Sequence, residues 1–192
     1  MSPENDTQQQ SMAATLSALL PLRSEGTMTT LRLLRETDVG AFHAYRSDAA
    51  LARYQGWSVM SAAQARAFID EMQDTRPFFA GGGWIQLAIA HAESDALLGD
   101  VGLFLSEDRS YGEIGFTLCA AAHGQGHATR AAIAATELLF ALTPAREVRG
   151  ITDARNSPSA RVLERAGFEQ ILVQQSVFKG EPCTELVYRR LR

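Results

Sequence analysis

The sequence predicts one mixed α/β domain in which about four helices pack on a mostly antiparallel sheet of about six to seven strands. Three observations lead to this prediction. The chain has 192 residues, 46% of them hydrophobic, which suits the core of a single domain. Strand-like segments follow one another directly in residues 84–118, which favours antiparallel pairing. Later strand-like segments alternate with helical ones, which favours helices packed on a mixed sheet.

The first 28 residues differ in composition from the rest of the chain. Residues 1–10 are polar, and residues 11–22 are mildly apolar. The segment lacks the basic start of a secretory signal, and it is too short and too interrupted to span a bilayer. We expect residues 1–28 to form a tail that is partly disordered or docks on the body, and residues 29–192 to form the domain.

The first half of the domain is predicted to contain a strand at residues 30–34 followed by two helices. Apolar residues repeat at helical spacing from Val39 onward. Ser61 with Gln64 forms the capping-box pattern that begins the second helix. A loop at residues 53–60 connects the two helices.

Glycine, proline and polar turns divide the rest of the chain into short elements. Three consecutive glycines at residues 81–83 precede the first of these strands. We predict strands at residues 84–90, 97–105, 111–118, 148–152, 168–178 and 183–188, and helices that begin at residues 128 and 156.

Composition argues against several classes of function. The net charge of −4 and the pI near 5.6 disfavour a nucleic-acid-binding protein, which would need a basic face. Cys119 and Cys183 lie far apart and lack the spacing of zinc ligands, so we expect neither a disulfide nor a metal site. These features fit a cytoplasmic protein that does not bind membranes, and a homodimer is the default oligomeric state.

The sequence HGQGHA at residues 123–128 lies between a predicted strand and a predicted helix. Gly124 and Gly126 have no Cβ atoms where a phosphate would approach the backbone, and the following helix offers unpaired N–H groups. No Lys-Ser or Lys-Thr pair follows, as a nucleotide P-loop requires. Thr129 stands at the third glycine position of a dinucleotide fingerprint, which disfavours a dehydrogenase. Taken alone, the turn therefore fits either a pyrophosphate site of another kind or a plain turn between a strand and a helix.

A second motif begins at Asn156, after the strand predicted at residues 148–152. Asn156 or Ser157 can cap a helix, and Pro158 suits its first turn. Gly167 can end the same helix in the left-handed conformation. We therefore expect a short helix with well-defined ends.

Together these motifs resemble those of the GNAT superfamily of acyl-coenzyme A N-acyltransferases. The turn at residues 123–128 is similar to the family's pyrophosphate loop, and residues 156–168 are similar to its Asn-x-x-Ser and Glu-Arg-x-Gly-Phe signature. The resemblance runs from about Thr29 to the C-terminus. Within the superfamily, residues 113–116 (EIGF) and 54–57 (YQGW) are similar to the branch that acetylates the N-termini of ribosomal proteins. The resemblance implies the GNAT fold and an N-acetyltransferase.

Acetyl-CoA is the cosubstrate that the resemblance implies, and no metal is implied. Backbone N–H groups of the turn would hold the pyrophosphate, and the strand edge beyond Glu113 would pair with the pantetheine amides. His123 replaces the Gln or Arg that is usual at the start of the turn. The side chains of His127, Arg130 and Arg155 are candidates for further phosphate contacts, or else solvated surface groups. The residues assigned to the coenzyme are Leu118, His123, Gly124, Gln125, Gly126, His127, Ala128, Thr129 and Asn156.

The catalytic residues are also assigned by resemblance. Glu113 is the candidate general base, acting through a water, and a strand-edge carboxylate in a salt bridge is the alternative. Many members of the superfamily protonate the leaving thiolate with a tyrosine in the helix that begins at Asn156, but this helix has no tyrosine. Ser159 is the candidate to hydrogen-bond the thiol sulfur, or else it completes the helix cap. By analogy, the backbone N–H of Leu118 would stabilise the oxyanion.

The acceptor side is assigned to Tyr54, Trp57 and Trp84. By analogy these aromatic side chains lie over the acceptor, although core packing explains any one of them alone. The expected acceptor is a protein or peptide N-terminus, and a small amine such as a polyamine, an amino acid or an antibiotic is the alternative. A non-catalytic acyl-CoA sensor of the same fold is the alternative of a different class, suggested by the missing tyrosine and by His123.

Overall fold

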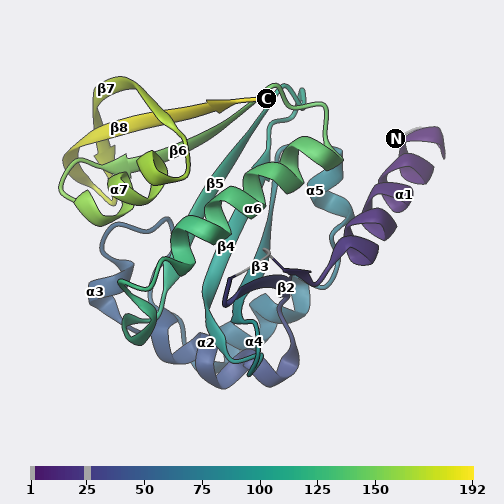
Figure 1. Ribbon diagram of the computed structural model, residues 1–192, viewed down its shortest axis with the longest axis horizontal. Helices are drawn as coiled ribbons and strands as arrows, with labels where there is room; N and C mark the ends of the chain where they lie inside the picture. Colours follow the sequence, from purple (N-terminus) through teal and green to yellow (C-terminus); the bar gives the residue numbers. More distant parts are fainter. Residues whose placement is uncertain (1–2, 24–26) are drawn as a thin grey trace.

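The computed structural model describes residues 3–23 and 27–192, whose strands form one eight-stranded sheet (Figure 1). The strand order is β1-β2-β3-β4-β5-β6-β8-β7. The strands are β1 (Leu22–Arg23), β2 (Thr29–Leu33), β3 (Gly83–His91), β4 (Leu97–Leu105), β5 (Tyr111–Leu118), β6 (Glu147–Asp153), β7 (Glu169–Phe178) and β8 (Glu181–Leu191). The helices are α1 (Pro3–Leu19), α2 (Val39–Arg46), α3 (Ala49–Ala52), α4 (Ala62–Glu71), α5 (Arg76–Ala80), α6 (His127–Leu142) and α7 (Ser157–Arg165), with 3-10 turns η1 (Glu36–Asp38) and η2 (Ala120–Ala122).

The sheet is antiparallel except between β5 and β6. These two strands pair in parallel only through residues 111–113 and 147–149. Beyond Glu113 they diverge, as Figure 1 shows, so the rest of β5 has no strand beside it on that side within the described residues. A strand edge that opens inside a sheet leaves backbone groups able to pair with an extended ligand.

The predicted mixed, mostly antiparallel sheet is confirmed, with one strand more than expected. The additional strand is β1, whose two residues are too few to give a periodic pattern, and its Leu22 pairs with Leu31 of β2. Helices α2, α4, α6 and α7 correspond to the four expected from the sequence. The additional helices are α1, in the N-terminal segment, and the short α3 and α5.

Helices cover both faces of the sheet because buried side chains alternate along its central strands. Leu87 and Ile89 of β3 contribute to a large core that also includes residues of α1, α5 and α6. Between them, Ala88 faces the opposite way, into a smaller core that includes Phe42 of α2 and Ile69 of α4. The two faces of the sheet thus carry separate cores, and α2 with α4 lies on the face opposite α6.

The N-terminal helix α1 packs against α5 and α6. Its Leu16 is fully buried in the larger core. Of the helices in the described part of the chain, none combines the length and the apolar content that crossing a bilayer requires.

Candidate functional site

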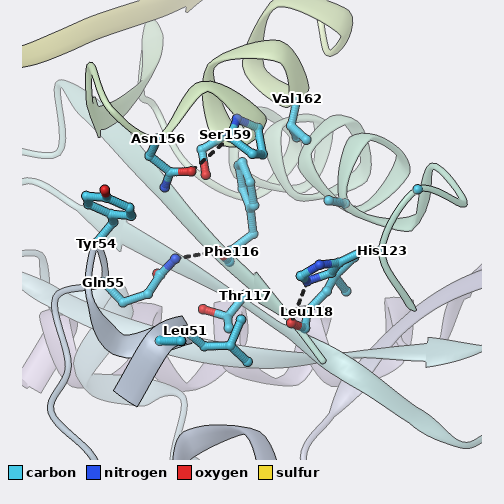
Figure 2. Close-up of a pocket in the computed structure, with 14 residues that line it drawn as sticks. Leu51, Tyr54, Gln55, Phe116, Thr117, Leu118, His123, Asn156, Ser159 and Val162 are labelled. Atoms are coloured by element: carbon cyan, nitrogen blue, oxygen red, sulfur yellow. Dashed lines mark hydrogen bonds between the residues drawn. The ribbon is translucent and has the colours of Figure 1, made fainter. Parts of the chain in front are cut away.

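A cavity of about 390 Å³ lies where β5 and β6 diverge, between α3, α7 and the turn that precedes α6 (Figure 2). Many of the residues predicted from sequence line it together. They are Tyr54, Leu118, His123, Gly124, Ala128, Asn156 and Ser159. The other lining residues are Ala50, Leu51, Gln55, Phe116, Thr117, Pro158 and Val162. We call this space the first cavity.

The turn before α6 presents free backbone donors. Gly124 and Gly126 have positive φ angles of 76° and 81°, a conformation that favours glycine. The backbone N–H groups of residues 124–129 make no hydrogen bond to any other described residue. Amides in the first turn of a helix also carry the positive end of its dipole. The turn therefore has the free donors that bind an anion such as a pyrophosphate.

The end of β5 presents a second set of free donors. The Cys119 N–H donates to a β4 carbonyl at 2.8 Å, and since backbone groups alternate along an antiparallel strand, those of Phe116 and Leu118 point away from β4. The Leu118 carbonyl lies 3.1 Å from Nε2 of His123, which must donate because a carbonyl only accepts. The Phe116 carbonyl accepts from Gln55 at 3.4 Å. The N–H groups of Phe116 and Leu118 have no acceptor among the residues described.

Three side chains considered for phosphate binding are engaged elsewhere. His127 is buried, its Nδ1 lies 2.8 Å from the Thr29 hydroxyl, and burial lowers its pKa. Arg130 donates to a carbonyl of the turn at 2.8 Å. Arg155 holds Asp153 by two hydrogen bonds of 2.9 and 2.6 Å. The free hydrogen-bond donors at this turn are therefore mainly its backbone N–H groups.

Helix α7 brings Asn156 and Ser159 to the first cavity. The side-chain oxygen of Asn156 caps the helix by accepting from the Ser159 N–H at 3.4 Å. The cap thus uses the amide of Ser159 and not its hydroxyl, which has no hydrogen-bond partner in residues 3–23 and 27–192. Tyr54, assigned from sequence to the acceptor, also lines the first cavity, where its ring lies beside Asn156 (Figure 2). A tyrosine is therefore present in this cavity although α7 carries none.

A second cavity of about 330 Å³ adjoins the first and shares Gln55, Phe116 and Thr117 with it. It lies on the face of the sheet covered by α2 and α4, and the predicted Trp57 and Trp84 both line it. The remaining lining residues are Arg46, Gly56, Met60, Phe68, Met72, Gln86, Gly102 and Gly115. This second cavity is bounded mainly by aromatic and thioether side chains.

One side of the second cavity is formed by a buried ion pair. Arg46 and Asp100 are each 1% exposed and form a salt bridge. Asp100 also accepts from the Tyr45 hydroxyl at 2.7 Å and from the Gln86 amide at 2.8 Å. Burial and the charge of Asp100 raise the pKa of Tyr45 well above its usual value. The Arg46 guanidinium stacks on Trp57, 4.5 Å from the ring centroid.

Glu113 lies on β5 two residues before Gly115, on the same face of the sheet, and lines neither cavity. Burial raises its pKa to about 7, a shift that the positive charge of Arg149 opposes and the negative charge of Glu185 increases. A carboxylate that titrates near neutral pH has the proton affinity that a general base requires.

Comparison with known proteins identifies the family. Residues 29–169 match the family described as the acetyltransferase (GNAT) domain, which is well over half of the chain. The chain belongs to this family. It is an acetyl-CoA-dependent N-acetyltransferase whose acceptor the comparison leaves open. No match was found among curated proteins.

Solved GNAT structures share the fold at low sequence identity. The GNAT-family acetyltransferase from Bacillus anthracis superposes with a TM-score of 0.75 at 20% identity, covering 86% of this chain and 95% of that one. The microcin C7 self-immunity acetyltransferase MccE, solved with acetyl-CoA and AMP, gives 0.77 at 15% identity, covering 92% and 99%. RimL, the ribosomal L7/L12 alpha-N-protein acetyltransferase, solved with coenzyme A, gives 0.74 at 18% identity, covering 88% and 96%.

Sequence reasoning assigns no role to several of the lining residues of this GNAT protein. Gln55 and Gly115 lie within the segments YQGW and EIGF, whereas Arg46 and Thr117 lie outside every motif. Arg46 is buried by its pairing with Asp100, which lies 54 residues away in sequence. Such a long-range pairing leaves no local pattern, because the neighbours of each residue in sequence are ordinary helix and strand residues.

Proposed function

We propose that this acetyltransferase acetylates the α-amine at the N-terminus of a peptide or protein. The observation that carries the proposal is the meeting of the two cavities at Gln55, Phe116 and Thr117. The first cavity suits the pantetheine arm, and the second suits the first residue of the acceptor. RimL, whose own acceptor is a protein α-amine, has the same fold and supports this choice.

The coenzyme would be held mainly by backbone groups. The pyrophosphate would accept hydrogen bonds from the free amides of residues 124–129. There is open space for it beside Gly124, since a Cβ built there would meet no atom within 4 Å. The pantetheine arm would extend along β5 as an added strand, with Asn156 facing it from α7. The thioester would then lie near Phe116 and Leu118, whose free N–H groups suit an oxyanion.

In the proposed reaction the amine nitrogen attacks the thioester carbonyl carbon. A C–N bond forms, the C–S bond breaks, and coenzyme A leaves as the thiolate. Glu113 takes a proton from the amine through a water, which its raised pKa of about 7 favours. The hydroxyl of Ser159 hydrogen-bonds the departing sulfur.

A small-molecule amine is the second candidate acceptor. The second cavity favours it because apolar walls and a buried ion pair surround a volume of about 330 Å³, which a compact molecule can fill. A sensor without activity would use the first cavity alone and would leave the second without a ligand.

Two measurements test the proposal. Saturating acetyl-CoA at ~100 times its Kd stabilises a binding protein by roughly 2.7 kcal/mol, which thermal denaturation detects. Release of free thiol is then followed with tetrapeptides that have free or N-acetylated α-amines. We expect turnover only with the free amine. Stabilisation without thiol release from any amine would indicate a sensor, and turnover of polyamines but not peptides would indicate the second candidate.

A further inference from the structure

Two hydrogen-bond donors that belong to residues lining the second cavity are buried without an acceptor. They are Nε of Arg46 and Nε1 of Trp57, and neither has a partner among the described residues. A buried donor that lacks an acceptor costs about 1–3 kcal/mol. Both groups are donors and both belong to residues that line one cavity, so a ligand in this cavity can pair with either of them only by offering an acceptor such as an oxygen.

The charge around these donors indicates that the acceptor oxygen is neutral. The positive charge of Arg46 is already balanced by Asp100, which Tyr45 and Gln86 also hold by hydrogen bonds. A carboxylate bound beside this pair would bring an uncompensated negative charge into a buried region, which is costly. A positively charged ligand group would lie next to the positive charge of Arg46, and Asp100 is already paired and could not neutralise it. A carbonyl oxygen accepts two hydrogen bonds without either cost.

The rest of the second cavity indicates a large apolar group. Met60, Phe68 and Met72 line it, and side chains of this kind adapt to apolar ligands. A Cβ added at Gly115 would meet no atom within 4 Å, so the space above the strand at this point is open. Trp84, which is 45% exposed, lines the cavity where it reaches the surface.

We propose that the second cavity selects amines that carry a large apolar side chain and a neutral carbonyl oxygen, which accepts hydrogen bonds from Arg46 and Trp57. This inference rests on the proposed function and narrows it to N-terminal residues such as phenylalanine, leucine or methionine followed by a peptide bond. The amine then lies toward Thr117, where the two cavities meet. On this proposal polyamines are poor acceptors because they lack both groups, and free amino acids are poor acceptors because they carry a carboxylate.

A set of four matched amines tests this selectivity, with kcat/KM measured by thiol release. Phenylalaninamide carries both the ring and the neutral carbonyl. 2-Phenylethylamine lacks the carbonyl, phenylalanine replaces it with a carboxylate, and serinamide lacks the ring. We expect phenylalaninamide to exceed each of the other three by at least about tenfold. Equal rates for phenylalaninamide and 2-phenylethylamine, or a preference for serinamide, would overturn the inference.

Two variants assign the selectivity to the cavity. Trp57→Phe keeps an aromatic ring but removes Nε1, so the preference for phenylalaninamide over 2-phenylethylamine should fall. Gly115→Val fills the open space, so the preference for phenylalaninamide over serinamide should fall. The Kd of acetyl-CoA, measured by calorimetry for each variant, reports whether the protein is folded and loaded. Unchanged preferences in variants that bind acetyl-CoA normally would contradict the inference.

The same assay with peptides that begin with serine or phenylalanine separates this inference from the proposed function. Efficient turnover of peptides that begin with serine, with poor turnover of those that begin with phenylalanine, would overturn the inference and leave peptide acetylation standing. Absence of turnover with every amine and peptide, despite stabilisation by acetyl-CoA, would overturn both.

Discussion

The ammonium group of Lys179 donates a hydrogen bond of 2.7 Å to the backbone carbonyl of Trp57, 122 residues away in sequence. The same group donates to the carbonyl of Ala52 at 2.8 Å. Lys179 is the only lysine in the sequence, and it lies in the turn between β7 and β8. This edge of the sheet thus holds the segment that brings Tyr54 to the first cavity and Trp57 to the second.

Replacement of Lys179 should weaken acceptor binding more than coenzyme binding. Lys179→Met removes both hydrogen bonds to the segment that carries Trp57, whereas the turn before α6 keeps its own backbone geometry. If the loss of these hydrogen bonds weakens acceptor binding by about 1 kcal/mol, KM for the amine rises about fivefold. We expect the Kd of acetyl-CoA to change less than twofold. Glu181→Gln, an exposed change in the same region, is the matched control, and an equal effect of both variants would contradict a specific role for Lys179.

The raised pKa of Glu113 predicts the pH dependence of the reaction. A general base acts when ionised, so protonation of Glu113 by itself lowers kcat/KM about tenfold for each pH unit below about 7, its pKa. Protonation of the α-amine, with a usual pKa of about 7.7–8.0, lowers it by a further factor of about ten per unit. The profile should therefore have an upper limb of about tenfold per unit just above pH 7 and a lower limb of about a hundredfold per unit below it. Glu113→Gln should remove the extra slope of the lower limb and leave the upper one. Glu185→Gln should move the lower limb to lower pH, because the charge of Glu185 raises the pKa of Glu113. A profile that Glu113→Gln leaves unchanged would rule out this base.

The same pKa predicts a pH dependence of stability. The folded protein keeps a proton on Glu113 up to about pH 7, whereas an unfolded chain loses it near pH 4.3. The folded state therefore binds more protons between these values, and its stability falls as pH rises through this window. Glu113→Gln removes this loss, so the Tm of the variant relative to the original protein should be higher at pH 8 than at pH 5. An equal Tm difference at the two pH values would contradict the shift.

Much of the fold could be predicted because its signals are local. The glycines of the turn, the cap at Asn156 and the capping box at Ser61 mark the starts of helices within a few residues. The alternation of side chains along the central strands indicates which of them point to the same face of the sheet. The short elements β1 and α3 were not predicted, because two to four residues cannot show a period.

The site was predictable only where a motif marks it. Gly124, Asn156 and Ser159 belong to such motifs and all line the first cavity. Arg46 and Lys179 do not, because each depends on a partner far away in sequence. The place of His127 in the turn makes its side chain a candidate phosphate contact, yet this side chain is buried against Thr29 of β2. The surroundings of these side chains depend on contacts with residues that are distant in sequence, and a single sequence carries no local pattern for such contacts.

The conformation of Gly126 predicts how coenzyme binding responds to a single methyl group. Gly126→Ala places a Cβ in the left-handed region, at a φ of 81°, and 2.9 Å from the Arg130 guanidinium. The strain should cost about 1–2 kcal/mol and displace the free amides, which raises the Kd of acetyl-CoA at least about tenfold in calorimetry. Gly167→Ala is the matched control, since its φ is 83° and its Cβ would meet no atom within 4 Å. A similar loss of affinity in both variants would attribute the effect to general destabilisation.

The unused hydroxyl of Ser159 predicts which group assists the leaving thiolate. Asn156 caps α7 through the Ser159 amide, so Ser159→Ala leaves the cap intact and removes only a hydroxyl that lines the first cavity. Loss of one hydrogen bond to the developing thiolate should lower kcat about tenfold with little change in the Kd of acetyl-CoA. Ser157→Ala, at the exposed start of the same helix, is the control and should leave kcat unchanged. Tyr54→Phe tests the other hydroxyl-bearing side chain of the cavity. A larger loss of kcat in Tyr54→Phe than in Ser159→Ala would transfer the role to the tyrosine, because each variant removes a single hydroxyl from a residue that lines the first cavity.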